Sequence, residues 1–210
     1  MSHIVLLGDS IFDNAVYVNG GPDVIAHLRK ILPSGWEATL LAVDGSVTED
    51  VAGQVKKIPP TATHLIVSAG GNDALGDIDI LHRPAESVGA ALSALGKLRA
   101  RFREDYRRMI ATLQSSGKPL AVCTIYDANF EDPTMREVVT TALTVYNDVI
   151  IREAVGFGLP ILDLRSICAG PDDYANEIEP GIQGGRKIAA GILELVRKHD
   201  FTTATASIYK

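Results

Sequence analysis

Three short segments of the sequence combine glycine with side chains that can act as nucleophiles or hydrogen-bond donors. They are Gly8-Asp9-Ser10, Asp44-Gly45-Ser46 and Gly70-Gly71-Asn72-Asp73, and each follows an apolar run of strand length. A serine at a turn between a strand and a helix presents its hydroxyl beside backbone N–H groups that face developing negative charge. Glycine lets the backbone approach a substrate closely, and asparagine supplies two neutral N–H donors. These residue types fit a serine nucleophile with an oxyanion hole.

Each segment also has an ordinary structural interpretation. Asp9-Ser10 could cap a turn or helix, Gly45 could serve a tight turn, and Gly71-Asn72-Asp73 could be a plain loop. All three occur in order, at the ends of successive predicted strands within about the first 75 residues, and this combination favours the catalytic interpretation. Three further acidic residues are interpreted as caps or loop groups outside the catalytic set: Asp13, Asp73 and Asp127.

The elements that must position these segments are indicated by alternating strand-like and helix-like runs. Strands are expected at Ile4–Leu7, Thr39–Val43, Leu65–Val67, Leu120–Ile125 and Pro160–Leu164. Helices are expected over residues 22–32, 48–57, 84–117, 134–155 and 182–198. The alternation is typical of βαβ units. It predicts a flavodoxin-like, three-layer α/β/α sandwich with a five-stranded parallel sheet of order 2-1-3-4-5, whose ligand site lies beyond the carboxyl ends of the strands.

Composition limits the partners that the chain can have. No repeat or low-complexity linker divides the 210 residues, so residues 1–200 are expected to form one domain and 201–210 a polar tail. The formal net charge of −6 disfavours nucleic acid and anionic membranes as partners. No apolar run approaches the roughly 18 residues of a membrane helix, and no segment has the form of a signal peptide, so a cytoplasmic location is expected.

The sequence does not predict a metal ion or an organic cofactor. Cys123 and Cys168 form no C-x-x-C pair and have no clustered histidines beside them, so both are expected to be reduced thiols that bind no metal. The G-x-x-x-x-G-K-[ST] and G-x-G-x-x-G motifs are missing as well, which argues against a nucleotide- or flavin-binding protein.

Through the three segments the sequence resembles the SGNH, or GDSL, hydrolases. The resemblance rests on Gly8-Asp9-Ser10-Ile11, on Gly45 and on Gly71-Asn72-Asp73, and it spans nearly the whole chain. It implies that Ser10 is the nucleophile and that the oxyanion binds to the backbone N–H groups of Ser10 and Gly45 and to the side chain of Asn72. The implied protein is a serine esterase that acts on a small ester or acyl substrate through an acyl-enzyme.

The last motif of that family is altered in this chain. Family members usually carry Asp-x-x-His-Pro, in which the histidine deprotonates the serine and the aspartate orients the imidazole. The matching stretch is Asn176-Glu177-Ile178-Glu179-Pro180, so Glu179 stands at the histidine position and Asn176 at the aspartate position. Because an asparagine side chain can donate a hydrogen bond to a carboxylate, the two replacements are expected to form a complementary pair.

Three explanations of the altered motif stay open. Glu179 replaces the general base, a histidine from elsewhere takes that role, or the chain binds a ligand without turning it over. Only His82 follows a strand at the correct edge of the sheet, and its spacing fits a solvated loop residue. The third explanation defines the alternative function, which is a catalytically weak or silent SGNH-fold protein that binds an acyl or carbohydrate ligand.

A carboxylate base predicts a distinctive dependence on pH. With a reference pKa near 4.3, against about 6.5 for histidine, a glutamate is expected to be a roughly tenfold weaker base. The same low pKa predicts activity at pH values where an imidazole is protonated. Donation from Asn176 would hold the pKa of Glu179 low and burial would raise it, so the sequence predicts only that the acidic limb has a carboxylate origin.

Overall fold

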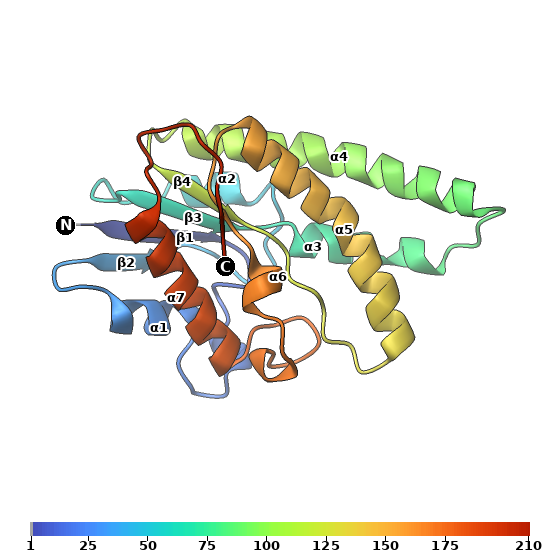
Figure 1. The fold of residues 1–210 in the computed structure, drawn as a ribbon, viewed down its shortest axis with the longest axis horizontal. Helices are drawn as coiled ribbons and strands as arrows, with labels where there is room; N and C mark the ends of the chain where they lie inside the picture. Colours follow the sequence, from blue (N-terminus) through green and yellow to red (C-terminus); the bar gives the residue numbers. More distant parts are fainter. Residues whose placement is uncertain (1) are drawn as a thin grey trace.

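A parallel β-sheet runs through the middle of the structure, and helices cover both of its faces (Figure 1). The structure is a computed structural model that describes residues 2–210. The strands are β1 (His3–Gly8), β2 (Glu37–Leu40), β3 (His64–Ser68), β4 (Leu120–Cys123), β5 (Ile161–Leu162) and β6 (Ile208–Tyr209). Their order is β2-β1-β3-β4-β5-β6, and all neighbouring strands are parallel.

Within residues 2–210 the sheet has six strands, which corrects the predicted number of five. The first five have the predicted order, and the sixth arises within residues 201–210, where the sequence predicted a polar tail. β6 consists of Ile208–Tyr209, which pair with Ile161 and Leu162 of β5. A run of two residues is too short for apolar alternation to indicate a strand, so only the pairing partner defines it.

Seven α-helices and three short 3₁₀ turns connect the strands within the described residues. The helices are α1 (Val24–Ile31), α2 (Val51–Val55), α3 (Gly71–Gly76), α4 (Val88–Gln114), α5 (Pro133–Gly156), α6 (Leu164–Ile167) and α7 (Ile182–Lys198). The 3₁₀ turns are η1 (Ala15–Tyr17), η2 (Ile78–His82) and η3 (Pro171–Asp173). α7 has the predicted bounds. α3, a six-residue helix directly after β3, is not among the predicted helices, because its Gly-Asn-Asp start is typical of turns.

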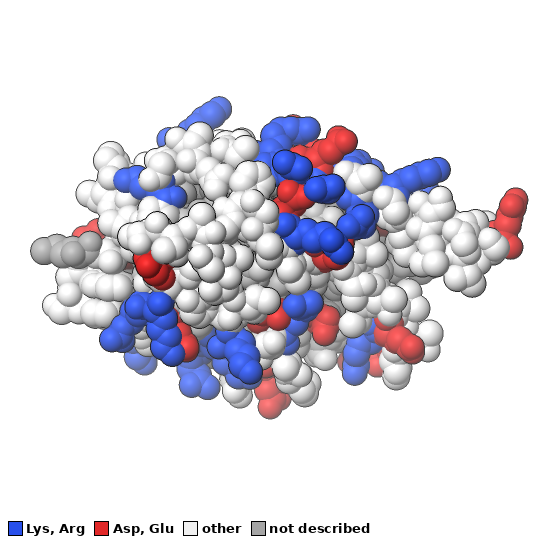
Figure 2. Space-filling model, turned by 45° about the horizontal axis from the view of Figure 1, so that its top comes forward, with Lys and Arg blue, Asp and Glu red and all other residues white. Residues whose placement is uncertain are grey.

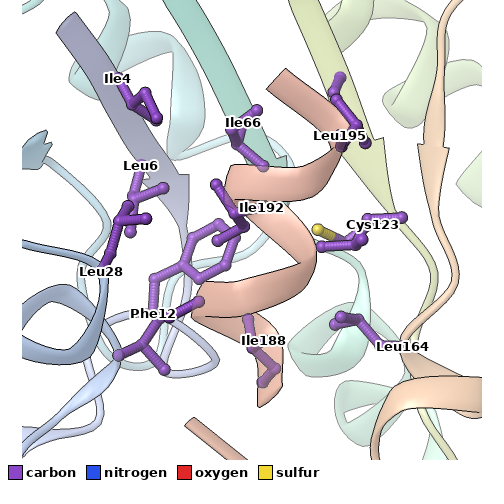
Figure 3. Close-up of a cluster of buried hydrophobic side chains, with 14 of the residues drawn as sticks. Ile4, Leu6, Phe12, Leu28, Ile66, Cys123, Leu164, Ile188, Ile192 and Leu195 are labelled. Carbon is purple, nitrogen blue, oxygen red and sulfur yellow. The ribbon is translucent and has the colours of Figure 1, made fainter. Parts of the chain in front are cut away.

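The central strands bury both of their faces, because successive side chains point to opposite sides of a sheet. In β1, Ile4 and Leu6 pack in the core shared with α1 and α7, whereas Val5 and Leu7 pack in the core shared with α2, α4 and α5. Figure 3 shows the first of these cores, in which α7 lies over the sheet. α7 and the chain that leads into it are therefore fixed against β1 by apolar contacts.

Side-chain caps set the first residues of three long helices. Asp23, Ser87 and Asp132 accept hydrogen bonds from backbone N–H groups at the starts of α1, α4 and α5, respectively. The sequence predicted proline starts at Pro22 and Pro84, one and three residues ahead of the first two caps. The capping oxygen decides the start, because it satisfies N–H groups that have no partner within the helix.

The surface that carries α4 and α5 has basic and acidic side chains close together (Figure 2). Glu153 pairs with Arg103 and Arg107, and Asp148 pairs with Arg99 and Arg152. The pairs with Arg99, Arg103 and Arg107 join α4 to α5 across the surface of the second core, whereas Asp148 and Arg152 both lie in α5. Among residues 2–210 there is no helix with the length and apolar character needed to cross a membrane.

We expect opposite effects on stability from alanine at two helical glycines. A Cβ at Gly184, in the first turn of α7, would lie 2.2 Å from the carbonyl oxygen of Asp173, whereas a Cβ at Gly96 in α4 would meet no atom within 4 Å. Gly184→Ala should lower the free energy of unfolding by about 1–3 kcal/mol through overpacking. Gly96→Ala should raise it by about 0.5–1 kcal/mol through the better helix propensity of alanine. Urea unfolding measures both, and an unchanged midpoint for Gly184→Ala would contradict the packing described.

Candidate active site

Ser10 lies on a tight turn that follows β1. The last residue of β1, Gly8, has φ +118°, and a Cβ there would lie 1.7 Å from a carbonyl oxygen of β3, so only glycine fits. The Asp9 side chain accepts a hydrogen bond from the N–H of Ile11 at 3.1 Å, which closes the turn. Phe12 is buried in the core beneath (Figure 3) and anchors the far end of the turn. The Ser10 hydroxyl is thereby held at the carboxyl end of the sheet.

The Ser10 hydroxyl donates a hydrogen bond to the Glu179 carboxylate. Oγ and Oε1 lie 3.0 Å apart, although the two residues are separated by 169 positions in the chain. Both side chains are buried, with Ser10 at 6% exposed and Glu179 at 5%. Among residues 2–210 the second carboxylate oxygen, Oε2, has no hydrogen-bond partner. The structure thus brings together the predicted nucleophile and the residue predicted as its base.

The loop that carries Glu179 is held on both sides of that residue. Asn14, which is fully buried, donates from Nδ2 to the carbonyl oxygen of Pro180 at 2.9 Å. The Tyr126 hydroxyl donates to the carbonyl oxygen of Ile178 at 2.6 Å. The sequence assigns no role to Asn14 or to the Tyr126 side chain, because no motif surrounds them and their partners are backbone atoms far away in the chain. They fix the backbone from which the Glu179 carboxylate extends.

Asn176 does not donate to the Glu179 carboxylate, which corrects the predicted pairing. Its Oδ1 accepts hydrogen bonds from the backbone N–H groups of Ile178 and Glu179, at 2.9 and 2.8 Å, and the residue is exposed. An asparagine side chain often closes such a local turn, because its oxygen reaches the backbone two or three residues ahead. Asn176 therefore shapes the loop and has no contact with the charge on Glu179.

Gly45 and Asn72 lie on adjoining segments beside the nucleophile turn. Asn72, in the first turn of α3, donates from Nδ2 to the carbonyl oxygen of Ser46 at 2.9 Å, and it lines the same pocket as Ser10. Gly45 is in an exposed turn with φ +80°. The Asp73 carboxylate accepts from both the N–H and the hydroxyl of Thr48, at 3.1 and 2.7 Å. Asp73 thus acts as the loop group that the sequence predicted.

Burial controls the ionisation of the two carboxyl groups next to the nucleophile. It raises the pKa of Glu179 to about 7, against a lowering by the Ser10 hydrogen bond and a further rise from the charge of Asp44. Burial also raises the pKa of Asp9 to about 8, although the hydrogen bond from Ile11 lowers it, and the charge of Glu179 adds to the rise. Near neutral pH Glu179 is therefore poised between its two forms, and Asp9 is largely protonated.

A mainly apolar pocket opens beside Ser10, between α3, η2 and the N-terminal half of α5. Asp9, Ser10, Asn72 and Glu179 contribute its polar end. No lysine or arginine is among the described residues that line it. Its other walls are made largely by aliphatic and aromatic side chains, which include Leu75, Ile78, Leu81, Phe130, Val139 and Leu143.

His82, His3 and His64 are not placed to act as a general base for Ser10. His82 ends η2 as an exposed residue and is not part of the pocket lining described above. His3 binds Thr39 and Thr61 at the amino end of β1, and His64 begins β3 at the same end of the sheet. Cys123 and Cys168 are free and buried, in agreement with their predicted reduced state.

The comparison with protein families covers most of these elements. Residues 6–182 match the model of the GDSL-like lipase/acylhydrolase family. The chain belongs to this family. The matched range begins within β1 and extends past Glu179, so the altered final motif lies inside the GDSL-family match. Among proteins with curated functions, no sequence gives a significant match.

Solved structures of similar fold include several lipases and related hydrolases. An extracellular lipase from Streptomyces rimosus has a TM-score of 0.68 and 18% identity, with 95% of this chain and 100% of that chain covered. A phospholipase A1 from Streptomyces albidoflavus NA297 has a TM-score of 0.67 and 15% identity, with 95% and 99% covered. A lipase/acylhydrolase from Enterococcus faecalis has a TM-score of 0.64 and 22% identity, with 94% and 96% covered. At these identities the comparison establishes a shared fold over nearly the full length of the chain.

The pKa of Glu179 provides a test of the site's electrostatics that does not depend on activity. Ser10→Ala removes a hydrogen bond to the ionised form and should raise the pKa, whereas Asp44→Asn removes a nearby negative charge and should lower it. Carboxyl ¹³C chemical shifts followed during a pH titration measure the value. Glu177→Gln, at an exposed position in the same loop, is the control and should shift it little. A wild-type pKa close to the ordinary 4.5 would refute the burial described.

Proposed function

We propose that the chain is a serine esterase that forms an acyl-enzyme at Ser10 and uses Glu179 as its general base. The observation that carries this proposal is the 3.0 Å hydrogen bond between the Ser10 hydroxyl and the Glu179 carboxylate. Membership of the GDSL-like lipase/acylhydrolase family independently supports an acyl-hydrolase activity. The N–H groups of Ser10 and Gly45 and the side chain of Asn72 are assigned to the oxyanion hole.

The reaction follows from the hydrogen-bond direction in the resting site. Ionised Glu179 takes the hydroxyl proton as Ser10 Oγ forms a bond to the ester carbonyl carbon, and the carbonyl oxygen becomes the oxyanion. Protonated Glu179 then gives its proton to the departing alkoxide, so an alcohol leaves and the acyl-enzyme remains. In the second half, Glu179 takes a proton from a water molecule as the water oxygen bonds to the acyl carbonyl carbon, and it then returns this proton to Ser10 Oγ as the acid leaves.

Burial makes glutamate a suitable base for this chemistry. At its ordinary pKa a glutamate would be roughly tenfold weaker than histidine for a Brønsted slope of about one half. The pKa of about 7 removes that disadvantage and makes the protonated form a usable acid near neutral pH. It also reverses the low-pH expectation from sequence: activity should fall as pH drops through about 7, because the base becomes protonated.

The pocket favours a neutral ester with an apolar acyl group. Its walls are mainly aliphatic, and it is lined by the carboxyl groups of Asp9, Asp77 and Glu179 but, among residues 2–210, by no lysine or arginine. An anionic acyl group would be repelled there, and a carbohydrate would leave its hydroxyl groups without partners against the aliphatic wall. The alternative of a silent binding protein for an acyl ligand shares this pocket and differs only in the reactivity of Ser10.

Labelling with a fluorophosphonate followed by mass spectrometry separates the two functions. We expect one adduct, on Ser10, and none in Ser10→Ala, whereas Ser166→Ala, which changes an exposed serine on α6, should label as the wild type does. Glu179→Gln should lower kcat/KM on an activated ester by about 10²–10⁴-fold, the usual effect of losing a general base. Its matched control is Glu177→Gln in the same loop. An adduct on another serine would refute the nucleophile, and a folded wild type without any adduct would support the silent binding protein.

A further inference from the structure

Gln54 of α2 makes an unusual set of contacts at the end of β1. Its Oε1 accepts from the N–H of Gly8 at 2.8 Å, and its Nε2 donates to the carbonyl oxygen of the same residue at 2.8 Å. The side chain is buried, at 4% exposed. The register of β2 against β1 ends at Leu6, so Gln54 supplies the N–H of Gly8 with a partner that the neighbouring strand does not provide.

The same amide also contacts the segment that follows β2. Nε2 of Gln54 lies 3.3 Å from the Ser46 hydroxyl oxygen, and the carbonyl oxygen of Ser46 accepts the side-chain N–H of Asn72 at 2.9 Å. Ser46 directly follows Gly45, and Gly8 lies two residues before Ser10. A continuous series of hydrogen bonds therefore joins the segments that carry the three groups assigned above to the oxyanion hole.

We propose that Gln54 is a positioning residue that holds the three oxyanion donors in fixed positions relative to one another. This inference rests on the proposed esterase function. Gln54 touches none of the reacting atoms. It acts through Gly8 on the turn that holds Ser10, and through Ser46 on the turn that holds Gly45 and on Asn72. Donors must converge on one oxygen to stabilise it, and a displacement of about 1 Å can cost about 10²-fold in rate.

Glutamine fits this position because Gly8 presents a donor and an acceptor to one side chain. A glutamate would accept from the N–H, but when ionised it would repel the carbonyl oxygen. A methionine fills similar space and forms neither hydrogen bond. Asparagine is shorter by one methylene and could not maintain both contacts without moving α2. The amide is thus required for its hydrogen-bond pattern as well as for its volume.

The test compares Gln54→Met with Thr63→Val. Thr63 binds the other end of β1 with the same pattern of hydrogen bonds that Gln54 makes to Gly8. Its Oγ1 accepts from the N–H of His3 at 2.8 Å and donates to the carbonyl oxygen of His3 at 3.2 Å. With a 4-nitrophenyl ester, Gln54→Met should lose about 10–100-fold in kcat with KM changed less than about twofold, and affinity for a trifluoromethyl ketone should fall in parallel. Thr63→Val should lower Tm and leave kcat within about twofold.

A second readout separates failure of this inference from failure of the proposed function. The order parameter of the Gly45 N–H, measured by ¹⁵N relaxation, should be near the rigid value of about 0.85 in the wild type and lower in Gln54→Met. If the wild type hydrolyses no ester, the esterase assignment fails while this measurement still decides the positioning role. Wild-type kcat and a rigid Gly45 in Gln54→Met would overturn the inference. Should that variant not fold, Gln54→Glu retains the bond from Gly8 N–H, and wild-type kcat there would equally overturn it.

Discussion

The Glu179 carboxylate is buried against the Ser10 hydroxyl, and the surrounding elements have to maintain that contact. A carboxylate in water is a weak base, and one freed of water with a single hydrogen-bond donor is a much stronger one. This increase in base strength depends on keeping water away from Oε2 and on keeping the hydrogen bond between Oε1 and the Ser10 hydroxyl. Asn14 and Tyr126 meet this need from opposite sides of the loop, and the packing of α7 fixes the chain that follows it.

This arrangement lowers stability at neutral and higher pH. The pKa of Glu179 is about 7 in the folded chain and near 4.5 when freely solvated, so the folded state binds the proton more tightly than the unfolded state does. Its contribution to stability is present below about pH 4.5 and is lost as pH rises through about 7. The surrounding apolar cores must supply that stability, which is consistent with a nucleophile turn anchored by Phe12.

The parts of the fold and site that sequence predicted are those with local signals. The bounds of α7 follow from its regular apolar spacing. The contact between Ser10 and Glu179 was predicted through the resemblance to the GDSL hydrolases, which places Glu179 at the position of the family histidine. The second strand was predicted to reach Val43 but ends at Leu40, because its regular register with β1 ends there, although Leu41, Ala42 and Val43 still donate backbone hydrogen bonds to β1. The sixth strand depends on a partner that sequence does not reveal.

The parts that sequence did not predict depend on geometry. Asn176 has the right chemistry to donate to Glu179, yet the loop directs its oxygen to two backbone N–H groups. Burial, which raises the pKa of Glu179, could be named from sequence, but the hydrogen bond that lowers this pKa comes from Ser10 and not from Asn176, and the balance depends on the degree of burial. Gln54 has no motif around it, since its partners are the backbone of Gly8 and a serine hydroxyl.

The pH dependence of Ser10 phosphonylation tests the central claim most directly. The second-order rate constant for inactivation by a fluorophosphonate reports the ionisation of whatever group activates the serine, without the later steps of turnover. A buried carboxylate base predicts a rate that rises with one ionisation near pH 7 and a pH-independent, much slower rate in Glu179→Gln. If Glu179→Gln keeps the same ionisation and the same rate, the base is another group and the account is contradicted.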